Sequence, residues 1–123
     1  MAYELTDADK RMLVGVDARL VELLERLAAR TPIQFKVIEG VRSAERQREL
    51  YAQKKTKTLK SRHLTGHAVD IAPLVAGKPS WQWEHYTPLI KTAKAIAAEL
   101  PTRFVFGYDW GWDAPHIEIR NVQ

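Results

Sequence analysis

A short stretch of the chain contains residue types that could hold a metal ion. The stretch is SRHLTGHAVD, residues 61–70, and it places His63 and Asp70 seven positions apart with Gly66 between them. Neutral imidazole and carboxylate groups both bind zinc well. A chain that turns at Gly66 can bring both side chains to one point, but two ligands are too few for a tight site. Taken alone, such a stretch is more often a polar turn than a metal site.

A second set of candidates lies near the C-terminus, in DAPHIEI. His116 begins a predicted strand there, and Asp113 comes three residues before it. Together, His63, Asp70 and His116 provide three protein ligands and leave a fourth position for water, which is typical of catalytic zinc sites. Asp113 is then the candidate base, because a nearby carboxylate can take a proton from the attacking water and pass it to a leaving amine. The alternative for Asp113 is a turn residue before proline.

These two motifs resemble those of the M15 zinc peptidases. Ser-x-His-x-x-Gly-x-Ala-x-Asp spans residues 61–70, and Asp-x-Pro-His-x-Glu spans residues 113–118, in the order found in that family. EGVRSAERQRELY and FGYDWGWDAPH are also similar to family segments, so the resemblance covers about residues 33–120. Two spaced motifs in the right order are a specific signal, whereas either alone would be weak.

The resemblance implies a set of roles. It places Zn²⁺ on His63, Asp70 and His116, with Asp113 as the base, and it gives Arg42 the task of steadying the oxygen of the scissile carbonyl. Arg42 could instead pair with a nearby glutamate at the start of a helix. Further residues that could orient a ligand or contact substrate are Ser61 and Gln47, which match the family pattern, and His67, Trp110 and Glu118, which lie near the motifs.

Within this family, the short chain and the segment VRSAERQ favour the phage L-alanyl-D-glutamate endopeptidases, or endolysins. The resemblance therefore implies a zinc-dependent hydrolase of peptidoglycan stem peptides. One alternative is a D-alanyl-D-alanine carboxypeptidase or dipeptidase. Another is a non-catalytic module, in which the basic run of residues 54–62 binds nucleic acid or a wall polymer and zinc is structural. Because the N-terminus lacks the pattern of a signal peptide, we expect the protein in the host cytoplasm until lysis releases it to the cell wall.

Composition narrows the classes of metal site and partner. The 123 residues include no cysteine, which excludes disulfides and thiolate zinc sites and leaves histidine and carboxylate as metal ligands. No run of about 18 apolar residues occurs, so we expect no membrane span. The net charge of +4 favours an anionic partner. We expect that partner to be peptidoglycan, with no role for nucleic acid, and we expect a monomer.

The order of predicted elements indicates an α+β fold. Apolar spacing predicts one helix from Thr6 to Arg30, a second over residues 44–54 with Leu50 and Tyr51 inward, and a third that begins at Thr87 and Pro88. Alternating residues predict strands in IQFKVIEG, HAVDIAP, RFVFGYDW and PHIEIR. We expect one catalytic domain over residues 1–123, without a wall-binding domain, in which about three helices pack on a small, mostly antiparallel sheet, as in Hedgehog and DD-peptidase folds.

Overall fold

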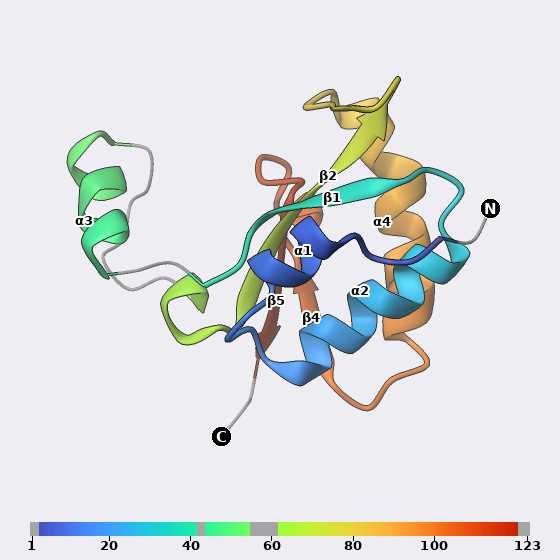
Figure 1. The fold of residues 1–123 in the computed structure, drawn as a ribbon, viewed down its shortest axis with the longest axis horizontal. Helices are drawn as coiled ribbons and strands as arrows, with labels where there is room; N and C mark the ends of the chain where they lie inside the picture. Colours follow the sequence, from blue (N-terminus) through green and yellow to red (C-terminus); the bar gives the residue numbers. More distant parts are fainter. Residues whose placement is uncertain (1–2, 42–43, 55–61, 121–123) are drawn as a thin grey trace.

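The protein is an α+β fold built on an antiparallel sheet (Figure 1). The computed structural model describes residues 3–41, 44–54 and 62–120. Its helices are α1 Asp7–Met12, α2 Ala18–Arg30, α3 Ala44–Ala52 and α4 Trp83–Ala97, with short 3₁₀ helices η1 Arg62–Thr65 and η2 Gly107–Trp110. Its strands are β1 Phe35–Glu39, β2 Ala68–Val75, β3 Lys78–Pro79, β4 Arg103–Phe106 and β5 His116–Arg120. The sheet order is β1-β2-β5-β4, and β3 pairs with β2. The predicted fold class is confirmed.

The two faces of the sheet have different chemistry because side chains alternate along each strand. On one face, Val69 and Ile71 of β2 and Ile117 and Ile119 of β5 are fully buried. They form one core with the leucines of α2 and the apolar side of α4. The intervening positions belong to the opposite face, which carries the polar residues of the two motifs. Strand alternation, as predicted from the sequence, therefore separates the core from the site.

The predicted helix from Thr6 to Arg30 is wrong in its continuity. Thr6 does form the expected capping box with Asp9, but the chain leaves helical geometry after α1 and starts again at α2. Gly15 has a φ of +83°, and Asp17 caps the second helix by accepting a hydrogen bond from the backbone N–H of Arg19. The apolar spacing continues across this break, so periodicity alone joined two helices into one. It therefore predicted three α-helices, whereas the described residues form four.

The predicted start of the last helix is also wrong. The helix begins at Trp83 with Gln82 as its N-cap, so Pro88 lies inside α4 and not at its first position. Starting earlier adds Tyr86 to the apolar side of the helix, where only 1% of it is exposed. Burial of an aromatic ring this size outweighs the one backbone hydrogen bond that Pro88 cannot donate.

Helix α3 forms where it was predicted but with a different orientation. Tyr51 is 48% exposed, so the expectation that it points inward is wrong, and Leu50 is only half-buried. Figure 1 shows α3 to one side of the sheet, at the end of the segment that follows β1. No helix in the described ranges has the length and apolarity to cross a membrane.

Candidate metal centre and active site

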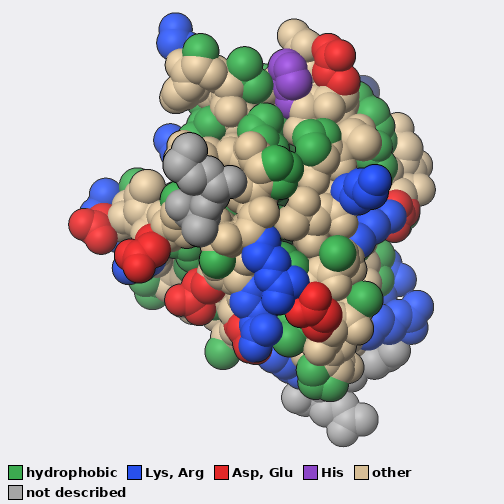
Figure 2. Space-filling model, turned by 90° about the vertical axis from the view of Figure 1, so that its right-hand side faces the viewer, with side chains coloured by type: hydrophobic (Ala, Val, Ile, Leu, Met, Phe, Trp, Pro, Cys, Tyr) green, Lys and Arg blue, Asp and Glu red, His purple; other side chains and the backbone are tan. Residues whose placement is uncertain are grey.

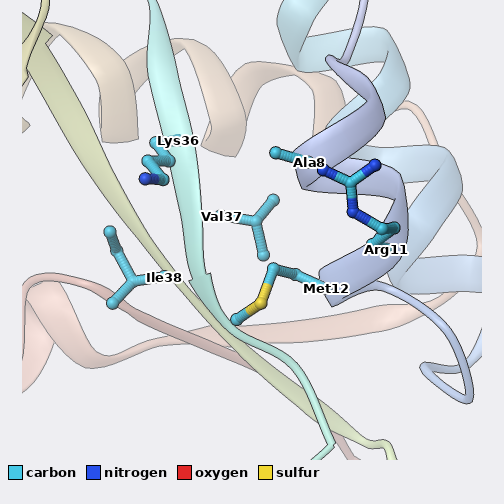
Figure 3. A pocket seen from close by; sticks show the side chains of 6 residues that line it. All are labelled: Ala8, Arg11, Met12, Lys36, Val37 and Ile38. Carbon is cyan, nitrogen blue, oxygen red and sulfur yellow. The ribbon is translucent and has the colours of Figure 1, made fainter.

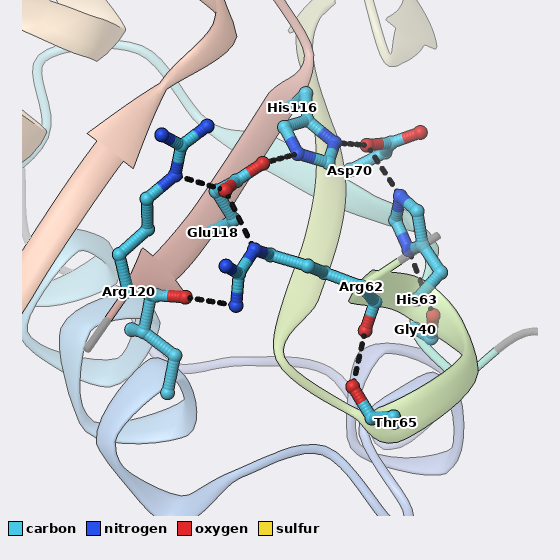
Figure 4. A network of polar contacts seen from close by, with 9 residues as sticks. Gly40, Arg62, His63, Thr65, Asp70, His116, Glu118 and Arg120 are labelled. Carbon is cyan, nitrogen blue, oxygen red and sulfur yellow. Dashed lines mark hydrogen bonds and ion pairs between the residues drawn. The ribbon is translucent and has the colours of Figure 1, made fainter. Parts of the chain in front are cut away.

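Three donor atoms meet on the polar face of the sheet. Asp70 of β2 and His116 of β5 are directly opposite each other in the antiparallel register, and His63 reaches them from η1. Asp70 Oδ1 lies 3.2 Å from His63 Nε2 and 3.3 Å from His116 Nδ1. Figure 4 shows the two imidazoles on either side of this carboxylate. The three donors lie within 4.8 Å of one another, so the two distant motifs converge on one point.

Gly66 makes the turn that delivers His63 to the site. Its φ is +77°, in the left-handed region that side chains disfavour, and a Cβ here would lie 2.4 Å from the carbonyl oxygen of Gly15. The Gly66 carbonyl accepts a hydrogen bond from the backbone N–H of Asp17. The turn is therefore held against the start of α2, and a residue with a side chain would push η1 away.

Hydrogen bonds on the far side of each ring decide which nitrogen can bind a metal. His63 Nδ1 lies 3.0 Å from the carbonyl oxygen of Gly40, which can only accept, so Nδ1 carries the proton. His116 Nε2 lies 2.8 Å from a carboxylate oxygen of Glu118 and donates to it for the same reason. In neutral imidazoles, the lone pairs of His63 Nε2 and His116 Nδ1 consequently both face Asp70.

Three acceptors that face one another need a positive charge between them. Without a metal, protons supply it: burial lowers the pKa of His116, but hydrogen bonds with Asp70 and Glu118 outweigh this and raise it to about 9. For Asp70, burial raises the pKa, whereas hydrogen bonds with His116 and His63 dominate and hold it well below its usual range. The site is thus arranged to stabilise a cation.

The spacing of the donors fits zinc. Ligands 2.0–2.2 Å from a tetrahedral ion are about 3.3–3.6 Å apart, close to the two separations seen here. Two imidazoles and one carboxylate are borderline-to-hard donors that suit zinc and do not form the all-oxygen shell of calcium or magnesium. The side chains of His63 and His116 are almost fully buried, whereas that of Asp70 is 21% exposed, so the site is open on the Asp70 side.

Glu118 holds His116 and is itself held by two arginines. Its carboxylate accepts hydrogen bonds from His116 Nε2 and from Arg120 Nε at 2.7 Å, and it forms an ion pair with Arg62 Nε at 3.0 Å (Figure 4). Burial raises the pKa of Glu118, but the hydrogen bonds from His116 and Arg120 outweigh it and lower the pKa to about 2. Glu118 is therefore charged at any pH near neutrality, and it keeps His116 in the tautomer that presents Nδ1 to the site.

Asp113 lies beside the metal donors, on the segment between η2 and β5. Its backbone carbonyl accepts a hydrogen bond from the N–H of His116, and its charge contributes to the raised pKa of His116. Gly107 lets this segment approach: a Cβ there would lie 2.2 Å from the Asp113 carbonyl oxygen and 2.9 Å from His116 Cβ. The glycine-rich lead into the second motif thus sets the position of Asp113.

Comparison with known proteins identifies the family of the chain. The family model for phage L-alanyl-D-glutamate peptidase matches residues 1–121. The chain belongs to the phage L-alanyl-D-glutamate peptidase family. It is 26% identical over 125 residues to the L-alanyl-D-glutamate peptidase of Escherichia phage T5, covering 98% of this chain and 91% of that protein. It also matches the crystal structure of the L-Ala D-Glu endopeptidase ChiX of Serratia marcescens, with a TM-score of 0.88 and 34% identity over 95% of this chain and 90% of that one.

Membership of the phage L-alanyl-D-glutamate peptidase family confirms the resemblance drawn from the two motifs. It also confirms the expectation of a peptidase of the class that hydrolyses peptidoglycan. Both named relatives are peptidases for the bond between L-alanine and D-glutamate, and neither is named as a D-alanyl-D-alanine enzyme.

Aromatic side chains form one wall beside the candidate metal donors of this family member. The Trp110 ring lies 5.3 Å from the His116 ring and 5.6 Å from that of Trp112. Trp112 is 74% exposed, so an apolar surface continues from His116 out to solvent. Trp110 was named from the sequence as a residue flanking the site, and the structure places it there.

The other residues named from the sequence lie at different distances from the donors. His67 contacts the Thr65 hydroxyl and is 3.9 Å from an Asp17 carboxylate oxygen, so it points to the start of α2 and is not in the metal-donor group. Gln47 is buried in α3. Arg42 and Ser61 are outside the described residues, so their roles stay predictions.

Two features of the site were not anticipated. Arg62 bonds Glu118 and the Ile119 carbonyl, and its only signal in the sequence is its place next to His63. Tyr86 is buried, and its hydroxyl has no hydrogen-bond partner among the described residues. Burial raises the pKa of Tyr86, and the charges of Asp70 and Asp113 raise it further. The position of Tyr86 in the apolar repeat of α4 does not predict that its hydroxyl lies near these two carboxylates.

A pocket elsewhere on the molecule does not contain the metal donors. It lies between α1 and β1 and is lined by Ala8, Arg11, Met12, Lys36, Val37 and Ile38 (Figure 3). The lining has two basic residues and four apolar ones, with no histidine or carboxylate. This pocket is therefore separate from the donor cluster and offers no imidazole or carboxylate to a metal ion.

Proposed function

We propose that this protein is a zinc-dependent endopeptidase that hydrolyses the L-alanyl-D-glutamate bond of peptidoglycan stem peptides. The observation that carries the proposal is the convergence of His63, Asp70 and His116, whose outer hydrogen bonds leave three lone pairs facing one point. Zinc, when bound there, supplies Lewis acidity and makes water more acidic. The names of the two relatives supply the bond.

Each residue then has a defined task. His63, Asp70 and His116 hold the ion, and Asp113 takes a proton from the water that attacks the alanyl carbonyl carbon. As the carbon–nitrogen bond breaks, Asp113 gives that proton to the amine of D-glutamate, so it begins and ends the reaction as a carboxylate. Arg42 is proposed to stabilise the negative charge that develops on the carbonyl oxygen.

The biological setting is also a proposal. We infer a phage or prophage endolysin that accumulates in the host cytoplasm as a monomer and reaches the wall when the cell lyses. Family membership and the absence of a spanning helix in the described ranges are compatible with this setting. Sedimentation at micromolar concentration tests the monomer, and expression with and without a pore-forming partner tests whether release is needed for lysis.

The proposed chemistry is tested by separating metal binding from cleavage. Peptidoglycan incubated with the zinc-loaded protein should release fragments with new N-termini on glutamate, whereas release of free D-alanine would point to a carboxypeptidase. Asp113→Asn should retain zinc and lose at least 100-fold in kcat, the lower part of the range for a general base. Asp7→Asn, in the first turn of α1, is the matched control and should cleave normally. Normal cleavage by Asp113→Asn would exclude Asp113 as the base.

A further inference from the structure

Three arginines lie together on the face of the sheet that holds the metal donors. Arg62 belongs to η1, Arg120 follows Glu118 on β5, and Arg103 faces Arg120 directly across the β4–β5 pair. Side chains at directly opposed positions of an antiparallel pair project from the same face and lie close together. The three guanidinium groups therefore gather at the β4–β5 side of the site.

This arginine cluster contains more positive charge than the fold neutralises. Arg62 and Arg120 share the single carboxylate of Glu118 through their Nε atoms, while both side chains remain 42% exposed. Arg103 is exposed and has no ion-pair partner among the described residues. Like charges directly opposite each other in a sheet are destabilising, so the pairing of Arg103 with Arg120 is a cost to the fold.

Several arginines elsewhere in the described chain have a carboxylate partner of their own. On and around α2 the pairs are Arg19 with Asp17, Arg26 with Glu22 and Arg30 with Glu99. Figure 2 shows basic and acidic side chains interspersed on the face of the molecule to the right in Figure 1. The arginine cluster thus sets three guanidinium groups against one carboxylate, and this excess of positive charge fits a ligand that brings negative charge.

The arginine cluster lies within reach of a peptide bound at the metal donors. Glu118 bonds His116 on one side and the two guanidinium groups on the other, so one imidazole ring and one carboxylate separate the arginines from the donor atoms. An extended chain advances 3.3–3.6 Å per residue. A carboxylate about two or three residues from the reacting bond can therefore contact the cluster.

We propose that Arg62, Arg103 and Arg120 bind the carboxylates of the stem peptide on the D-glutamate side of the cleaved bond. The inference rests on the proposed function. Of the two residues that this bond joins, only glutamate has a second carboxyl group, and the methyl side chain of alanine offers no charge. The arginine cluster consequently fixes the direction of the substrate: the D-glutamate side lies toward β4 and β5, and the L-alanine side lies away from them.

The test compares peptides that differ only in charge. Synthetic peptides with an L-alanyl-D-glutamate bond vary at two carboxyl groups. One is the carboxyl group of D-glutamate that is not part of the peptide chain, and the other is the C-terminal carboxyl group. Each is prepared as the acid and as the amide. Wild type should cleave the acids with a kcat/KM roughly fivefold above that of the amides, the scale of a few partly exposed ion pairs. This acid-to-amide ratio should fall toward one at 0.5 M salt, because the guanidinium groups are exposed.

Variants of the arginine cluster should lose the acid-to-amide ratio. Arg103→Gln and Arg120→Gln should each lower it to about twofold, and the double variant to about one, with bound zinc retained in Arg103→Gln. Arg26→Gln removes the same charge from α2, where the side chain is 44% exposed, and should keep the wild-type ratio. The acid-to-amide ratio compares two substrates of the same variant, so a general loss of activity lowers both kcat/KM values and leaves the ratio unchanged.

The outcomes separate the inference from the function it rests on. If wild type cleaves neither acid nor amide, the proposed function itself is wrong. If wild type cleaves the peptides and the arginine variants keep the full acid-to-amide ratio at both positions, the arginine cluster does not bind substrate carboxylates. Slower digestion of whole cell walls by these variants, with unchanged ratios on soluble peptides, also overturns the inference and assigns the arginines to another anionic wall polymer.

Discussion

Replacing Glu118 by glutamine should weaken zinc binding without removing any zinc ligand. Glu118 is 5% exposed, accepts hydrogen bonds from His116 and Arg120, and forms an ion pair with Arg62. Glutamine keeps the shape of the glutamate side chain but loses its negative charge. Its NH₂ group is a donor, and it must face the N–H of at least one of these three residues. The bond to His116 Nε2 then becomes a neutral one or is lost. Changes to groups that orient a metal ligand typically cost 10- to 100-fold in affinity, or about 1.4–2.7 kcal/mol.

The loss of zinc affinity can be measured as a smaller zinc-dependent increase in the free energy of unfolding. At a free zinc concentration 100 times the wild-type Kd, zinc stabilises the wild type by about 2.7 kcal/mol. At the same concentration, a Kd raised 10- to 100-fold leaves a gain of only about 1.4 to 0.4 kcal/mol by the same relation. Denaturant unfolding with zinc and with chelator measures the gain, and titration against a chromophoric chelator gives Kd directly. Taking the difference between the two unfolding curves removes any effect of the substitution on the metal-free fold.

The matched control is Glu22→Gln on α2. Glu22 pairs with Arg26, and both side chains are close to half exposed, so this ion pair contributes little and touches no zinc ligand. The control should keep the wild-type gain. If Glu118→Gln binds zinc within about twofold of wild type, the argument that an outer carboxylate fixes the His116 tautomer is wrong, even though the distances are correct.

Three further predictions concern protons, the core and the approach of two segments. Since the pKa of His116 is raised to about 9, zinc must displace its proton at lower pH, so chelator titrations from pH 6.5 to 9 should show affinity rising about tenfold per pH unit. In chelator, the protonated ring stabilises the fold fully below about pH 6.5, and urea midpoints should fall as pH rises through about 9. Tyr86→Phe removes a buried hydroxyl without a described partner and should leave the free energy of unfolding unchanged or raise it by about 1 kcal/mol, measured in urea. Gly107→Ala would place a Cβ 2.2 Å from the Asp113 carbonyl oxygen and should lower both the urea midpoint and kcat on peptidoglycan, since the segment carrying the base must shift.

The sequence predicted structure best where a residue pattern allows only one local geometry. Alternation of apolar residues located β2 and β5 and the face on which Asp70 and His116 lie, because a strand has only two faces. Helix ends were less well determined. The break at Gly15 and the early start of α4 both depend on which apolar residues find a core, and that is a property of the packed chain rather than of its spacing.

The same distinction explains what could be said about the site. His63, Asp70 and His116 could be grouped because metals require particular donors, and few residues of those types stand in such motifs. The partners that set their chemistry carry no such mark. Gly40 acts through a backbone carbonyl, which every residue has, and Arg62 is one of many basic residues in its part of the chain. Such partners become recognisable only when the fold brings them within hydrogen-bond distance.

The outer hydrogen bonds therefore matter more to the metal proposal than the proximity of the donors. Histidine and aspartate side chains that merely cluster would let the imidazoles choose tautomers that donate to the carboxylate, which gives a stable network without an ion. Here Gly40 and Glu118 occupy the far nitrogens with groups that accept, so each neutral ring must turn its lone pair toward Asp70. Only protons or a metal ion can offset the repulsion between these lone pairs and the Asp70 carboxylate. The raised pKa of His116 shows that, without a metal, a proton is bound there. In chelator, the site binds this proton firmly, and zinc binding releases it. The fold therefore stabilises a cation at this position before any metal binds.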